Sequence, residues 1–321
     1  MTGIPRAPLG GLPPVLRGCV SFFLLSLNTV MCASLMMPPA VLKLIVPIAS
    51  ARRRIDPLLN SLVEVWAANN DRWLRLVQTV RWEITGMEGL QRKAWYLVVA
   101  NHQSWADIFV MQKVFSRRIP VLKFFLKREL MWVPFAGLAW WALDFPFMKR
   151  HSEQFLREHP ERRGEDLKAI RQACEKFSLV PTAVMTFLEG TRFTKGKHDA
   201  TQSPYDHLLR PKAGGIALAL SAMGEYFHSL VDVTIHYPQG VPTFFDFLSG
   251  KTSEVVVHVA EQAIPGSLLG GDYGEDLDFR TRMQTWVNEL WSAKDRRLQS
   301  FREASSPLKE LQSGSGRQTP A

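Results

Sequence analysis

Trp95-Tyr-Leu-Val-Val-Ala100 and the Asn101-His102-Gln103-Ser104-Trp105-Ala106-Asp107 that follows it decide the fold expected for this chain. The uncharged run predicts a buried β-strand, because short apolar runs bounded by polar residues are typical of strands in a sheet core. A helix-like stretch over 105–115 begins directly after it. At such a strand-to-helix junction, polar side chains lie at the mouth of an α/β sheet, where ligands usually bind.

The same alternation of strand and helix continues along the chain. It predicts an α/β fold with a largely parallel central sheet flanked by helices. The expected strands are 95–100, 182–187, 230–237 and 254–259, and the expected helices are 56–80, 105–115, 164–177, 214–223 and 279–301.

The N-terminal segment 18–42 carries no charged residue and is long enough to cross or deeply enter a bilayer. Arg17 and Lys43 flank it, and Pro38 and Pro39 interrupt it near its end. One hypothesis is a single spanning helix. Another is a helical hairpin that dips into one leaflet and is broken at the prolines. A signal peptide and a buried helix of a soluble protein are the alternatives.

Three regions are therefore expected. Residues 1–55 form a hydrophobic membrane anchor or re-entrant helical hairpin, and residues 56–303 form the α/β domain. Residues 304–321 form a disordered tail, because this stretch is rich in Ser, Gly, Gln and Pro.

The composition bounds the class of protein. Of 321 residues, 46% are hydrophobic and 21% charged, which indicates a folded chain. The net charge of +9 suits an anionic lipid or a phosphorylated substrate. Nucleic acid is disfavoured as a partner, because the basic residues are spread out and accompany an apolar N-terminus. Cys19, Cys32 and Cys174 have no metal-type spacing and no disulfide framework, so a reducing compartment is expected.

His102 and Asp107 are the first candidates for chemistry. Five residues apart across the strand-to-helix turn, they can approach each other. An imidazole paired with a carboxylate acts as a general base, because the carboxylate fixes the tautomer and stabilises the imidazolium. Such a base deprotonates a substrate hydroxyl without an enzyme nucleophile. The alternative is a histidine that caps a helix beside an aspartate on a solvated face.

A second group, 187–192, follows the expected strand 182–187. Arg192 offers a planar fork of donors suited to phosphate. Gly190 lets a ligand approach the backbone, and its N–H is a candidate oxyanion donor. The alternative is an ordinary turn with a surface arginine, in which Glu189 pairs with a nearby base.

Two further basic groups are weaker on their own. Phe147-Met-Lys-Arg150 could supply phosphate contacts, and Lys212 precedes a helix whose N-terminal N–H groups favour an anion. A solvated turn and a surface lysine are the respective alternatives.

These groups occur in a recognisable order: Asn-His-x4-Asp at 101–107, Phe-x-x-Arg at 147–150, Glu-Gly-Thr-Arg at 189–192, and Pro238 at a strand end. Together they resemble the motif blocks of the glycerolipid acyltransferases, the PlsC-type 1-acylglycerol-3-phosphate acyltransferase family. The resemblance covers roughly 82–259. The sequence of residues 141–150 is similar to that of the YihG-type bacterial branch of the family. This branch is itself similar to the lysocardiolipin-type acyltransferases.

The resemblance implies the glycerolipid acyltransferase fold and a role for each matching residue. His102 would deprotonate the free hydroxyl of lysophosphatidic acid, and Asp107 would orient it. The hydroxyl would attack the thioester of acyl-CoA or acyl carrier protein and give phosphatidic acid. The residues implied in substrate binding are Arg150, Glu189, Gly190, Thr191, Arg192 and Lys212. Leu188 stands where the family usually has Pro, and Lys149 where it often has Asp.

The resemblance also implies the setting. No metal and no cofactor are expected beyond the acyl donor as co-substrate. The expected partners are a lysophospholipid, membrane lipid and, as a candidate, acyl carrier protein. The expected place is a bacterial inner membrane with the catalytic domain facing the cytoplasm. Another lysophospholipid acceptor and an inactive scaffold of the same fold are the alternatives. A hydrolase is disfavoured, because no G-x-S-x-G elbow is present.

Overall fold

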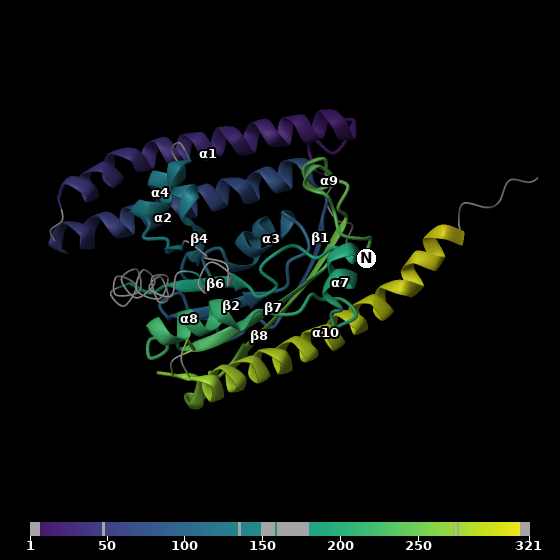
Figure 1. The fold of residues 1–321 in the computed structure, drawn as a ribbon. Coiled ribbons are helices and arrows are strands. Elements are labelled where there is room, and N and C mark those ends of the chain that lie inside the picture. Colours follow the sequence, from purple (N-terminus) through teal and green to yellow (C-terminus); the bar gives the residue numbers. More distant parts are fainter. Residues whose placement is uncertain are drawn as a thin grey trace, which may run out of the picture.

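The computed structural model describes residues 7–46, 49–133, 136–148, 158, 180–271, 273–274 and 276–314. A six-stranded sheet in the order β1-β8-β7-β2-β6-β3 forms its centre (Figure 1). The strands are β1 (Arg81–Thr85), β2 (Tyr96–Ala100), β3 (Leu122–Phe124), β6 (Ala183–Phe187), β7 (Ser229–His236) and β8 (Glu254–Gln262).

The sheet is largely parallel, as the sequence predicts. β2 runs parallel to β6 and β7, and β3 runs parallel to β6. β8 is antiparallel to β7, and β1 is parallel to β8, so this pair is reversed at one edge. The short strands β4 (Leu126–Lys127) and β5 (Phe147–Met148) pair with each other outside the sheet.

Helices cover both faces of the sheet (Figure 1). α2, α3 and α9 lie on one side, with α1 outermost, and α8 and α10 lie on the other. The helices are α1 (Pro14–Ile45), α2 (Ala49–Val77), α3 (Ala106–Phe115), α4 (Ala136–Ala142), α7 (Lys195–Thr201), α8 (Ala213–Met223), α9 (Phe244–Leu248) and α10 (Leu277–Gly314). The helix expected over 164–177 lies outside the described residues.

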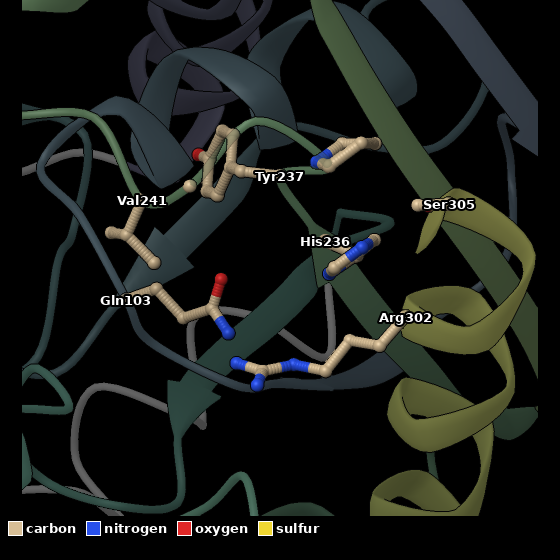
Figure 2. A pocket seen from close by; sticks show the side chains of 8 residues that line it. Gln103, His236, Tyr237, Val241, Arg302 and Ser305 are labelled. Atoms are coloured by element: carbon tan, nitrogen blue, oxygen red, sulfur yellow. The ribbon is translucent and has the colours of Figure 1, made fainter. Parts of the chain in front are cut away.

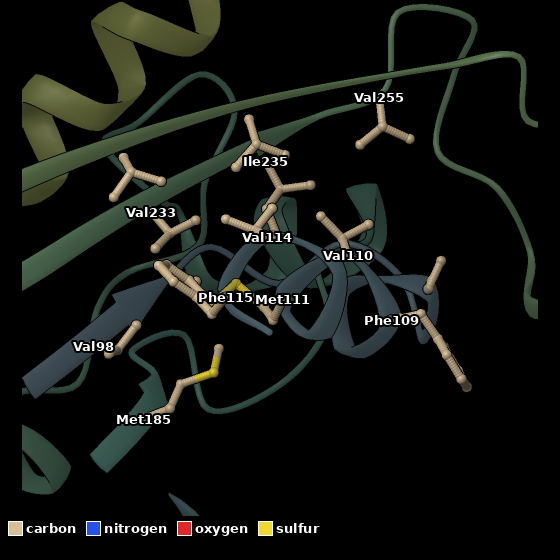
Figure 3. Packing of buried hydrophobic residues seen from close by; sticks show 14 of the residues in the cluster. Val98, Phe109, Val110, Met111, Val114, Phe115, Met185, Val233, Ile235 and Val255 are labelled. Carbon is tan, nitrogen blue, oxygen red and sulfur yellow. The ribbon is translucent and has the colours of Figure 1, made fainter. Parts of the chain in front are cut away.

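β2 is the strand around which both cores are built, because all of its residues are buried. Leu97 and Val99 pack in the core that α8 and α10 cover. Val98 and Ala100 pack on the opposite face against α3, where Figure 3 shows the apolar side chains that fill the layer. Alternation along the strand therefore supplies both cores, which is why the run is continuously apolar.

The N-terminal helix differs from the expectation at its prolines. α1 continues through Pro38 and Pro39, and the hairpin is formed by α1 with the antiparallel α2. An interior proline removes a hydrogen bond and usually bends or breaks a helix. Here Met36 and Ala40 are buried against α2 and α4, so packing holds the helix on both sides of the prolines. Of the alternatives that the sequence leaves open, the one that breaks the helix at the prolines is therefore wrong.

α1 is the helix in the described part of the chain that is long and apolar enough to cross a membrane by length and composition. Only 22% of its most apolar window is buried. Its outer face exposes large apolar side chains, among them Phe22, Phe23, Val30, Met31 and Leu35.

Lys43 joins this hairpin to the rest of the protein. The sequence places it as a charge flanking the apolar segment, yet its side chain is 2% exposed. Its Nζ lies 2.7 Å from Asp56 Oδ1 in α2 and donates to the carbonyl of Ala142 at the end of α4, also at 2.7 Å. It also pairs with Asp144. One buried cation thus connects α1, α2 and α4, and its partners offset the cost of removing it from water.

The C-terminal helix is longer than expected. α10 runs to Gly314, whereas the sequence pattern ends at about residue 301 and predicts disorder from residue 304. Leu308, Lys309, Glu310 and Leu311 are good helix formers, so the sequence after Pro307 favours a helix. The helix therefore continues past its expected end, and the disordered tail stays a prediction.

We expect Lys43→Ala to destabilise the protein by about 2–3 kcal/mol. Removing one partner of a buried ion pair costs about 3–5 kcal/mol, and the partial exposure of Asp56 reduces this. Arg75→Ala is the matched control, because Arg75 pairs with Asp71 while 73% exposed, and we expect a loss below about 1 kcal/mol. Chemical denaturation followed by Trp fluorescence measures both. Equal losses would contradict a structural role for Lys43.

Candidate active site

Three parallel strands end at one edge of the sheet and bring their following loops together. In the register of the sheet, Ala100 of β2 lies opposite Phe187 of β6 and Val233 of β7. The residues that follow these strands, including His102, Glu189 and Tyr237, are therefore neighbours although they lie far apart in the sequence. Asn101 strengthens the junction, because its side chain exchanges two hydrogen bonds with the backbone of Ile235.

His102 and Asp107 form the pair that their spacing predicts. His102 Nδ1 lies 2.9 Å from Asp107 Oδ2. The imidazole is 13% exposed and the carboxylate is fully buried. Asp107 is in the first turn of α3, where the helix dipole favours a negative charge.

The carboxylate accepts hydrogen bonds at both oxygens. Asp107 Oδ2 also accepts from the backbone N–H groups of Gln103 and Ser104, at 2.6 and 2.9 Å. Asp107 Oδ1 accepts from the hydroxyl of Tyr237 at 2.6 Å. A buried charge is tolerated when it is hydrogen-bonded in this way. Burial first, and then the Asp107 carboxylate, raises the pKa of Tyr237 well above 10, so the phenol stays protonated as a donor.

The surroundings fix the tautomer and the plane of His102. An ionised carboxylate only accepts, so Nδ1 carries the proton and Nε2 is left as the basic nitrogen. The ring stacks on Phe187 with centroids 4.0 Å apart and an interplanar angle of 14°. The backbone carbonyl of His102 accepts from the N–H of Phe193 at 2.7 Å. The imidazole is thus pre-oriented by β6 as well as by its own loop.

Glu189 holds the loops in place. The resemblance implies a substrate-binding role for it, yet it is 1% exposed. Its Oε1 accepts from the backbone N–H of His102 at 2.8 Å, and its Oε2 accepts from that of Leu209 at 3.0 Å. Burial raises the pKa of Glu189 to about 7. Glu189 is therefore placed as a positioning residue behind His102.

Gly190 has a different role from the one expected. Its N–H donates to the carbonyl of Phe187 at 2.9 Å and so is not a free oxyanion donor. This hydrogen bond closes the tight turn after β6. Gly190 adopts φ +68°, and a Cβ there would lie 3.4 Å from Cδ of Lys212, so the residue lets that lysine approach the turn closely.

The rest of the third motif forms an exposed basic surface. The guanidinium of Arg192 lies 5.0 Å from the ring centroid of Trp105. Lys197 donates to the hydroxyl of Thr191 at 2.7 Å, and Lys212 stands at the N-cap position of α8 beside Gly190, without a capping hydrogen bond from its side chain. The cations at 192, 197 and 212 are all exposed and suited to a phosphate.

Sequence reasoning missed two of these residues. Tyr237 could have been found from the sequence, because it lies between the end of β7 and the motif residue Pro238. For Lys197, the sequence offered no indication beyond its position shortly after the third motif. Arg150 and Lys149 lie outside the described residues, and β5 ends just before them at Met148. Among the described residues, no group of three or more His, Cys, Asp or Glu side chains could hold a metal ion.

The core of the chain is similar to proteins of a known family. Residues 81–238, from β1 to the residue after Tyr237, match the family model described as Acyltransferase. The matched stretch is just under half of the chain, and its core is similar to this family. Its boundaries include the loops that carry His102, Glu189 and Tyr237, while α1, α2 and α10 lie outside the matched stretch.

Individual relatives are distant. 1-acyl-sn-glycerol-3-phosphate acyltransferase 3 of Arabidopsis thaliana is 26% identical over 219 residues, 64% of this chain and 53% of that protein. Lysocardiolipin acyltransferase 1 of Danio rerio is 26% identical over 260 residues, 77% of this chain and 62% of that protein. The chain thus spans about half to three fifths of the length of these relatives.

The crystal structure of the 1-acyl-sn-glycerophosphate acyltransferase PlsC from Thermotoga maritima is also similar. Its TM-score is 0.49 at 17% identity, and the match covers 86% of this chain and 95% of that one. The YihG-type branch stays a prediction.

We expect Tyr237→Phe to lower the rate of acyl transfer about ten- to a hundredfold, because a hydrogen bond to a charged group contributes roughly 1.5–3 kcal/mol. The acceptor KM should not change. The loss should appear in kcat, because the phenol contacts the catalytic carboxylate and no substrate. Tyr205→Phe, which removes a hydroxyl bonded to Asn288 instead, is the control. An unchanged kcat in Tyr237→Phe, or an equal loss in Tyr205→Phe, would count against the assignment.

Proposed function

We propose that this protein transfers a fatty acyl group from acyl-CoA or acyl carrier protein to the free hydroxyl of lysophosphatidic acid, giving phosphatidic acid. The observation that carries the proposal is the His102–Asp107 pair, which lies at the mouth of the sheet in a core that is similar to the acyltransferase family. The exposed side chains of Arg192 and Lys212 carry the positive charge that would bind the acceptor phosphate.

The reaction follows from the protonation state of the pair. His102 Nε2 takes the proton of the acceptor hydroxyl as its oxygen attacks the thioester carbonyl. The C–O bond forms, the C–S bond breaks, and the departing sulfur receives the proton from the imidazolium. Asp107 stabilises the imidazolium between these two steps. No acyl-enzyme is needed, because the acceptor itself is the nucleophile.

The acceptor phosphate is assigned to Arg192 and Lys212. Both side chains are exposed, and they extend from the turn after β6 and from the start of α8. Trp105 lies against the guanidinium of Arg192 and restricts its orientation, which favours a fixed fork for phosphate. Arg150 is proposed to add to this site on the strength of its place in the second motif.

A different lysophospholipid acceptor is the second candidate. The Danio rerio relative is named for lysocardiolipin, and it matches more of this chain than the Arabidopsis relative does. Lys149, where the family often has Asp, adds positive charge in the second motif and would suit a more anionic headgroup.

The apolar face of α1 is proposed to lie in the membrane. Because the helix packs lengthwise on α2, its exposed face would enter one leaflet while the domain stays at the surface. The catalytic domain would then face the cytoplasm at a bacterial inner membrane and take its acceptor directly from lipid.

We expect His102→Ala to lower acyl transfer about 10²–10⁴-fold, the range that a general base contributes. Purified protein would be assayed with acyl-CoA and acyl carrier protein donors against a panel of lysophospholipids. His228→Ala is the matched control, because His228 lies at the opposite end of β7 and is 60% exposed. Equal turnover in wild type and His102→Ala would exclude the mechanism. No turnover with any acceptor would favour the inactive scaffold.

We expect Phe22→Ser/Phe23→Ser to weaken binding to anionic vesicles about tenfold or more, because two exposed aromatic side chains leave the apolar face. Vesicle sedimentation measures the bound fraction. Leu277→Ser is the control, since Leu277 is 70% exposed at the start of α10, on the other side of the sheet. Equal loss in the control, or none in the double variant, would contradict the proposed membrane face.

A further inference from the structure

A cavity of about 260 Å³ opens at the carboxyl edge of the sheet, beside the site described above. Its walls come from the loop after β2, from the end of β7 and from α10, and Figure 2 shows the side chains that line it. The polar lining consists of Gln103, His236 and Tyr237 on the sheet side and Arg302 and Ser305 on the helix side.

The cavity contains a buried amide oxygen that has no partner among the described residues. Gln103 is 8% exposed, and its Oε1 has no hydrogen bond within the described structure. Figure 2 shows the amide pointing into the cavity. The guanidinium of Arg302 extends toward it from α10, and none of the ion pairs found among the described residues includes Arg302. A buried polar atom is costly when unpaired, so this lining suits an occupant that brings hydrogen bonds.

The cavity shares its wall with the catalytic pair. Gln103 directly follows His102, and its N–H donates to Asp107. Tyr237 donates to the other oxygen of the same carboxylate. His102 itself does not line the cavity, so an occupant would reach its imidazole by running along the edge of the sheet.

One substrate of the proposed reaction has no residues assigned to it. The acceptor phosphate is complemented by Arg192 and Lys212, whereas the thioester donor must approach by a separate route. The donor carries a phosphopantetheine arm with amide groups along its length and a phosphate at its far end. An amide such as that of Gln103 pairs with amides, and a guanidinium such as that of Arg302 pairs with phosphate.

We propose that this cavity binds the phosphopantetheine arm of the acyl donor, with the amides of the arm at Gln103 and its phosphate at Arg302. The inference rests on the proposed function. The volume suits an arm and not a whole donor, because sites for complete small molecules occupy roughly 300–1,000 Å³. The same arm is present in acyl-CoA and in acyl carrier protein, so the cavity serves either source.

The C-terminal helix gains a function in this arrangement. Arg302 lies well beyond the matched core, which ends at residue 238. α10 therefore supplies a wall of the donor site from outside the stretch that matches the family model. Its continuation across the edge of the sheet places that wall opposite Gln103 (Figure 2).

The test is steady-state kinetics of Arg302→Ala in the full-length protein, with acyl-CoA and with acyl carrier protein as donors. We expect the KM for both donors to rise about ten- to a hundredfold, the effect of losing one charge-assisted hydrogen bond, with the acceptor KM unchanged. Arg296→Ala, an exposed arginine of α10 outside the cavity, is the control and should leave both constants unchanged. Gln103→Leu should raise the donor KM in the same direction.

Each other outcome overturns the inference. A rise for acyl-CoA alone places Arg302 against the nucleotide, and a rise in the acceptor KM makes the cavity an acceptor site. Unchanged constants leave the cavity without a role in donor binding.

Calorimetric titration with phosphopantetheine alone separates this inference from the proposed function, because it needs no turnover. Binding by wild type and its loss in Arg302→Ala support the inference even if no lysophospholipid is acylated. Equal binding by both proteins contradicts it even in an active acyltransferase.

Discussion

The buried carboxylate of Asp107 is the constraint on which the site depends. Within the described residues it receives an imidazole, two backbone N–H groups and a phenol. These donors come from the loop after β2 and from the end of β7, and the carboxylate itself belongs to α3. A charge without access to water holds all three segments in one geometry, because each lost donor weakens its compensation and loss of the phenol leaves Oδ1 unpaired. The loops are therefore positioned by electrostatics as much as by apolar packing.

The parallel strands explain why these groups converge. β6, β2 and β7 are adjacent and run in the same direction, so their following loops share an edge. Glu189 then joins two of the loops by accepting a hydrogen bond from the backbone N–H of His102. Asn101 joins β2 to β7 through its hydrogen bond to the carbonyl of Ile235. The exposed cations extend from the same loops. The order of the strands thus determines which motifs lie next to each other. Hydrogen bonds to the backbone then fix the distances between them.

The sequence pattern predicted the features that depend on residues close together in the chain. The apolar runs located the strands, and the spacing of His102 and Asp107 located the pair. What it missed depends on tertiary partners. Pro38 lies within a continuous helix because packing flanks it, and Lys43 is buried because two carboxylates from other segments meet it. The N–H of Gly190 and the partner of Tyr237 likewise follow from contacts that only the folded chain creates.

The triple attachment of Lys43 has a mechanical consequence. It joins the apolar helix to α2 and, through Ala142 and Asp144, to the segment that leads into β5. With α1 in the bilayer as proposed, hairpin and catalytic core would tilt and rise together as one rigid body. The height of the imidazole above the lipid would then be a fixed property of the protein. A lipid would be selected partly by how far its hydroxyl can be lifted out of the leaflet, independently of any contact with its headgroup.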